Sequence, residues 1–170
     1  MSHALALLLL LLGRAPAPPK PLAGYNEAVV ERFAVEKDCE LSPLQSDAVQ
    51  KTVVTRLRAR KIVAVIDTLD AGGEELAKTP PAEGVKRMTV TATVLEFAHG
   101  SRTARSIGIG AGATKLRVRF TIKDALTGTE LFTTERLGRY SRGDGTNEAG
   151  FSAVACEVVD GLIAEIEKNR

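Results

Sequence analysis

The sequence predicts one α/β domain of the α+β kind, in which a mixed five-stranded sheet carries two long helices on one face. Apolar residues recur at helical spacing in two segments, 44–60 and 151–166. Strand-like runs follow one another near the centre of the chain, over 88–97, 116–123 and 130–140. With two earlier strand-like runs, the expected order is β-α-β-β-β-β-α.

The first of those runs, residues 25–35, is apolar on both sides of an extended chain. Odd-numbered residues such as Val29 and Phe33 lie on one side, and even-numbered residues such as Val30 lie on the other. Because both sides are largely apolar, an inner strand is expected. Ser42 and Pro43 then provide a cap and a first helical residue for the helix over 44–60.

The middle of the chain contains a second buried strand and a long connection. The continuous apolar run 62–66 predicts a strand buried on both faces. Residues 67–85 contain Gly-Gly and Pro-Pro, which predicts an irregular segment with a single helical turn near 74–78. In the strand over 88–97 the apolar side changes after Val94, so a bulge is expected there.

The last two strands are joined by a turn over 124–128, where Gly128 suits a positive φ. Their pairing is expected to bring charged residues together on an open sheet face, forming weak cross-strand ion pairs. These residues are Arg117, Arg119, Lys123, Glu130, Glu135 and Arg136.

The N-terminal segment, residues 1–23, is expected to be a targeting segment, and the domain then spans 24–170. The apolar run 4–12 is too short to cross a bilayer, which needs about 20 residues, and it fits the apolar region of a secretory signal peptide. The small residues over 15–17 fit a cleavage site, although Pro18 would hinder the cut. We expect export to the periplasm or cell envelope; an uncleaved anchor or a misassigned start codon is the alternative.

The charge balance excludes a typical nucleic-acid-binding protein. The net charge of +2 comes from Arg14 and Lys20 in the N-terminal segment, which contains no acidic residue. The expected domain is therefore neutral, whereas nucleic-acid binding needs a basic surplus on one face.

The candidate binding site is the glycine-rich segment 98–115, expected to be the tip of a long hairpin. Its candidate residues are cations, isoleucines and glycines: Arg102, Arg105, Ile107, Gly108, Ile109, Gly110, Gly112 and Lys115. Apolar side chains on a protruding tip favour contact with another envelope protein or a membrane surface. The alternative is a loop that folds back on its own domain.

The same glycines are also similar to a phosphate-binding loop. However, Leu116 follows Lys115 where such a loop has Ser or Thr, and a strand follows where such a loop has a helix. The sequence also has no His, Cys or carboxylate cluster at metal-ligand spacing, so no metal, cofactor or catalytic residue is expected. Cys39 and Cys156 are expected to remain unpaired because no spacing rule links them; a disulfide in an oxidising compartment is the alternative.

Several motifs resemble those of a bacterial group, domain-of-unknown-function family 4410. They are the Val-Leu-Glu-Phe of 94–97, the Gly-Ser-Arg-Thr-Ala-Arg of 100–105, the Gly-Ile-Gly-Ala-Gly of 108–112 and the Asp-Ala-Leu-Thr-Gly of 124–128. The resemblance spans about residues 25–166. It implies a small exported protein with a fold similar to the TolB N-terminal domain, and with no assigned activity. Many members are lipoproteins, but Tyr25 stands where the lipid-carrying cysteine would be, so no lipid anchor is expected.

These observations predict a non-catalytic binding or assembly module of the cell envelope that contacts a partner through 98–115. Two alternatives stay open. One is a small phosphate- or nucleotide-binding enzyme that uses Arg102, Arg105 and Lys115. The other is a cytoplasmic adaptor whose apolar start is not a signal.

Overall fold

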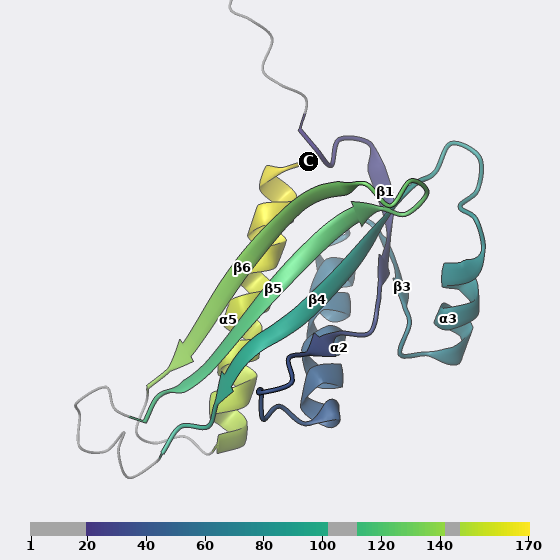
Figure 1. Ribbon diagram of the computed structural model, residues 1–170. Helices are drawn as coiled ribbons and strands as arrows, with labels where there is room; N and C mark the ends of the chain where they lie inside the picture. Colours follow the sequence, from purple (N-terminus) through teal and green to yellow (C-terminus); the bar gives the residue numbers. More distant parts are fainter. Residues whose placement is uncertain (1–19, 102–111, 142–146) are drawn as a thin grey trace, which may run out of the picture.

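The computed structural model describes residues 20–101, 112–141 and 147–170 (Figure 1). The predicted α+β fold is confirmed as a single domain with a mixed sheet. Its elements are, in order, β1 (Tyr25–Val30), β2 (Ala34–Val35), α2 (Pro43–Arg60), β3 (Ala64–Asp67), α3 (Ala71–Lys78), β4 (Lys86–Ala98), β5 (Thr114–Asp124), β6 (Glu130–Tyr140) and α5 (Asn147–Lys168).

The sheet has the strand order β3-β1-β4-β5-β6, and β2 pairs with β4 beyond the end of β1. The strands β3, β1, β2 and β4 run parallel to one another, because α2 returns the chain from β2 to β3. The strands β4, β5 and β6 are antiparallel neighbours. The sheet is therefore parallel on one side and antiparallel on the other.

The helices α2 and α5 lie side by side on one face of the sheet (Figure 1). The core lies between them and the sheet, where Val53, Phe120 and Leu162 are fully buried. Burying this apolar layer is the main source of stability. The predicted placement of two long helices on one face is thus confirmed.

The start of α2 follows the predicted signal closely. The Ser42 hydroxyl accepts a hydrogen bond from the Gln45 N–H at 3.3 Å, and the Gln45 side chain accepts one from the Ser42 N–H at 3.1 Å. This reciprocal capping box satisfies two helix-end donors, and Pro43 stands in the first turn, where its missing N–H is harmless.

Three predicted elements need correction. The strand over 25–35 is split into β1 and β2, which makes the sheet six-stranded. The strand predicted over 62–66 as buried on both faces is β3, an edge strand whose Ala64 is exposed; an apolar run alone does not distinguish an edge strand from an inner one. The predicted single turn is α3, an eight-residue helix.

Two local predictions are confirmed. The pairing of β4 with β5 shifts register between Val94 and Glu96, which is the expected bulge. Gly128 has a φ of 70° in the turn between β5 and β6.

Both ends of the described domain meet at one end of the molecule (Figure 1). The N–H of Leu22 donates to the carbonyl of Asn169 at 2.9 Å, and Leu22 is fully buried. The packed domain therefore includes this residue of the 1–23 segment. The ends of β4 and β5 that border 102–111 lie at the opposite end of the molecule.

Candidate functional site

The predicted hairpin site lies only partly within the described residues. Six of its candidate residues, Arg102, Arg105, Ile107, Gly108, Ile109 and Gly110, lie outside them. Gly112 has a φ of 87°, and β5 begins at Thr114. The segment therefore joins two antiparallel strands, as expected. A strand follows this segment, whereas a helix follows a phosphate-binding loop.

The base of the hairpin is fixed against α5. Phe97, near the end of β4, contacts Phe151 edge to face, with ring centroids 5.7 Å apart. Thr114, at the start of β5, is buried, and its hydroxyl accepts a hydrogen bond from the Gly100 N–H at 3.2 Å. Gly150 of α5 packs so closely that a Cβ there would lie 2.8 Å from the Thr114 Oγ1. Both strands therefore reach 102–111 from a defined position.

Lys115 lies opposite Ala98 of β4 and Arg139 of β6 in the sheet register. It is half-buried and alternates with the buried Thr114 and Leu116, which places it on the face away from α2 and α5.

An ion-pair network continues along this open face. Arg117 pairs with Glu96 at 3.2 Å and with Glu135 at 3.1 Å, and Arg119 pairs with Glu135 at 3.4 Å. The hydrogen bond from Arg117 lowers the pKa of Glu135 below its ordinary value. The expected cross-strand pairs are thus confirmed for Glu135, and the register places Lys123 opposite Glu130.

Arg136 does not belong to this network. The register places it opposite Val118, a core residue, so its side chain lies on the helix-covered face and pairs with Glu165 of α5 at 2.7 Å. The expectation that Arg136 joins the open-face charges is therefore wrong.

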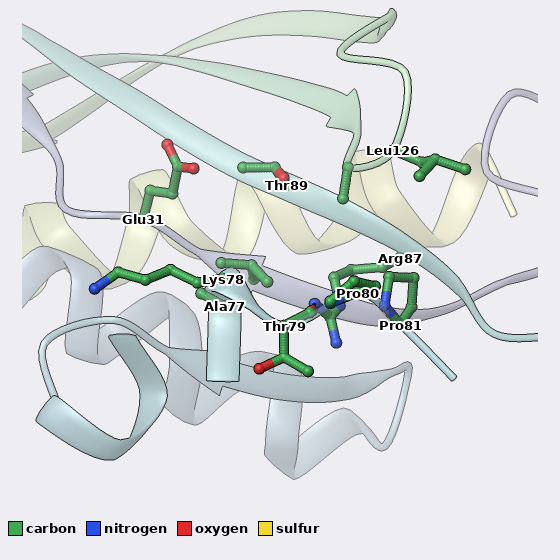
Figure 2. Close-up of a pocket in the computed structure, with 11 residues that line it drawn as sticks. Glu31, Ala77, Lys78, Thr79, Pro80, Pro81, Arg87, Thr89 and Leu126 are labelled. Atoms are coloured by element: carbon green, nitrogen blue, oxygen red, sulfur yellow. Dashed lines mark hydrogen bonds between the residues drawn. The ribbon is translucent and has the colours of Figure 1, made fainter. Parts of the chain in front are cut away.

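The open face also contains a pocket of about 310 Å³ that the sequence did not predict (Figure 2). The pocket lies between the end of α3, the outer sides of β1 and β4, and the β5–β6 turn. Its lining comprises Val29, Glu31, Ala77, Lys78, Thr79, Pro80, Pro81, Arg87, Thr89, Ala125 and Leu126. In Figure 2, Arg87 lies at one end with the two prolines, and Glu31 and Lys78 lie at the other.

Arg87 is the unusual residue of this pocket, because its charged side chain is only 5% exposed. Its Nε donates to the Glu27 Oε2 at 2.5 Å, and its Nη1 donates to the Thr79 carbonyl at 2.5 Å. A buried guanidinium needs such partners, since an unpaired buried charge is strongly unfavourable. The pair joins β1, β4 and the segment after α3.

Comparison with known proteins identifies the family of the chain. Residues 29–143 match the family described as Domain of unknown function (DUF4410). The chain belongs to this family. The match covers most of the DUF4410 chain and includes the glycine-rich segment, which confirms the resemblance read from the motifs. No curated protein matches the chain.

Solved structures with a similar fold are distant in sequence. A variant PelC dodecamer from Paraburkholderia phytofirmans has 18% identity and a TM-score of 0.57, over 91% of this chain and 94% of that one. The hypothetical protein CT253 from Chlamydia trachomatis has 13% identity and a TM-score of 0.57, over 85% and 97%. The lipoprotein GNA1162 from Neisseria meningitidis has 13% identity and a TM-score of 0.50, over 84% and 99%. These likenesses show the fold of the DUF4410 chain.

Within residues 20–101, 112–141 and 147–170, no group of three His, Cys, Asp or Glu is placed to hold a metal ion. In the same residues, no helix combines the length and apolar character needed to cross a membrane. Cys39 and Cys156 are both free cysteines.

Tyr25 has a structural role in the DUF4410 domain. Its hydroxyl donates to the Asp124 Oδ2 at 2.6 Å. Burial, with this hydrogen bond second, raises the pKa of Tyr25 to about 12. The same bond, with backbone donors from the turn, lowers the pKa of Asp124. The residue thus ties β1 to the end of β5.

Proposed function

We propose that this DUF4410 protein is a non-catalytic module of the cell envelope that binds or assembles with a partner through the hairpin 98–115. The partner is another envelope protein or a membrane surface. The observation that carries the proposal is the anchored base of the hairpin, where Phe97 and Thr114 are held against α5.

Anchoring matters because binding must offset the conformational entropy of the segments that it orders. A loop whose two ends are already fixed loses less freedom on binding than a loop on mobile strands. Ile107 and Ile109 supply apolar surface within the segment, and Arg102 and Arg105 flank them with positive charge. This combination suits a partner with an apolar patch bordered by acidic groups.

The envelope location is supported by two independent features. The first is the apolar run 4–12, which fits a secretory signal. The second is the likeness in fold to the lipoprotein GNA1162. The PelC neighbour was solved as a dodecamer, so a second copy of the chain belongs among the partners to test.

The test replaces both Ile107 and Ile109 by Ser in the full chain. The matched control is Leu126→Ser, which replaces an exposed apolar side chain at the turn at the opposite end of the sheet. A photo-crosslinking residue at the neighbouring position 106 or 127 then identifies what each site touches in intact envelopes, and it can be combined with each Ser variant. Sedimentation of the purified protein detects self-association, and vesicles of anionic lipid detect membrane binding.

The proposal predicts a specific crosslinked partner at position 106, reduced at least tenfold by the double Ser variant and unchanged by the control. The free energy of unfolding should be the same in all variants. If position 106 yields the same products as position 127, the hairpin is not the contact site. N-terminal sequencing of the native protein separates export from a cytoplasmic adaptor.

A further inference from the structure

We propose that the pocket between α3 and β4 binds a small monoanionic carboxylate, which Arg87 holds at the end formed by the two prolines. This inference does not depend on the hairpin. It concerns the end of the sheet opposite the hairpin, next to the β5–β6 turn, and a ligand of small size.

Arg87 has hydrogen-bond donors that no group of the described residues uses. A guanidinium has five N–H donors, and two of them are used, one by Nε toward Glu27 and one by Nη1 toward Thr79. Within residues 20–101, 112–141 and 147–170, Nη2 makes no hydrogen bond. The fully buried side-chain atoms without a partner in the same residues are Gln50 Oε1 and Arg136 Nε, so the Arg87 Nη2 is not fully buried, and Arg87 is one of the residues that line the pocket.

The charges around Arg87 determine which ligand could accept hydrogen bonds from its free donors. A 95% buried cation with free donors in a pocket is satisfied best by an anionic oxygen, because charge-assisted hydrogen bonds are the stronger class. Glu27 already neutralises much of the Arg87 charge. Glu31 adds a negative charge at the other end of the pocket, where Lys78 is engaged by Glu75 at 2.8 Å. This balance suits a single negative charge and disfavours a phosphate dianion.

The size and the lining of the cavity limit the size of the ligand. Its volume of about 310 Å³ is at the lower end of the range for small-molecule sites, roughly 300–1,000 Å³. Val29, Ala77, Pro80 and Pro81 supply apolar walls, and the Thr89 hydroxyl, which has no partner in the described residues, supplies a second polar contact. The ligand is therefore a carboxylate with a short apolar group, as in an N-acylated small amino acid or the C-terminal residue of a peptide.

The experiment titrates the full-length ¹⁵N-labelled protein with N-acetyl-alanine and follows the Arg87 Nε–H signal and the amides of residues 77–81 and 87–89. We expect saturable shifts of these signals. Ala77→Leu fills the cavity and should abolish them. Ala71→Leu adds the same side chain at an exposed position of the same helix, outside the pocket lining, and should leave them unchanged. Thr89→Val removes one hydroxyl and should weaken binding about threefold to tenfold.

Further probes distinguish the source of the carboxylate. If a short peptide with a free C-terminus binds and its C-terminal amide does not, the site accepts a chain end. If N-acetyl-alanine alone binds, the ligand is a small free acid. Either result supports the inference. Absence of shifts with every carboxylate probe, equal shifts in the Ala77→Leu variant, or tighter binding of inorganic phosphate would overturn it. The Ile107 and Ile109 double variant should bind normally, which separates this result from the outcome for the hairpin.

Discussion

Two glycines at the contact between α5 and β6 provide a matched pair of substitutions with different expected outcomes. Gly138 lies on β6, and a Cβ there would be 2.5 Å from the carbonyl oxygen of Val154 in α5. Gly161 lies on α5, and a Cβ there would be 3.1 Å from the Cδ of the Arg136 side chain on β6. Each Ala variant adds one methyl group to the same interface from opposite sides.

The expected magnitudes differ because the obstacles differ. At Gly138 the methyl group meets backbone, so the whole helix must move, and overpacking of this kind costs about 1–3 kcal/mol. Removing a strand glycine returns about 0.5–1 kcal/mol of conformational entropy, which leaves a net loss of roughly 1–2 kcal/mol. At Gly161 the methyl group meets a long side chain that can shift by a few tenths of an ångström. The helix propensity gain of about 1 kcal/mol then makes Gly161→Ala neutral or stabilising.

Urea denaturation followed by circular dichroism measures both effects. The midpoint of Gly138→Ala should fall while the slope of the free energy against urea stays unchanged, because the surface exposed on unfolding is the same. The midpoint of Gly161→Ala should be equal to or above that of the unchanged protein. If Gly138→Ala is as stable as Gly161→Ala, the close contact between β6 and α5 is not rigid and the reasoning is refuted.

Three further predictions concern stability. Leu22→Ala should lower the free energy of unfolding by about 2–5 kcal/mol because Leu22 is fully buried, whereas Leu126→Ala, at an 82% exposed residue, should change the urea midpoint little. The folded pKa of Tyr25, about 12, lies above the unfolded value of 10, so the stability that this group contributes should be retained below pH 10 and fall between pH 10 and about 12. The folded pKa of Asp124 is lowered, so the stability that this group contributes should be lost as the pH falls below about 4. Thermal melts recorded across both pH ranges should show a melting temperature that depends less on pH for Tyr25→Phe than for the unchanged protein. Ser42→Ala should cost about 1 kcal/mol through loss of the cap of α2, and an unchanged melting temperature would contradict that role.

Much of the fold could be predicted because its strongest signals are local. The apolar repeat over 151–166 predicts α5, the alternation over 116–123 predicts β5, and Ser42 with Pro43 predicts the start of α2 within one residue. Each of these patterns depends on residues close together in the chain.

The errors come from features that depend on distant neighbours. The glycine pair at 72–73 indicated a breaker, yet Gly73 is required inside α3, because a Cβ there would overlap the carbonyl of Asp67 at the end of β3. The pocket combines residues from Val29 to Leu126 on four segments, so no local pattern indicates it. No local pattern indicates the role of Arg87 either, because its partners Glu27 and Thr79 are set by parallel pairing and by the position of α3.

The position of the chain ends has a consequence for how the molecule reaches its surroundings. Leu22 is bonded to Asn169 at one end of the domain, and the hairpin begins at the other, alongside the start of α5. The 22 residues of α5 span about 33 Å between these ends. A tether attached ahead of Lys20 would therefore leave the ends of β4 and β5 that border 102–111 directed away from it, at a distance set by the length of one helix.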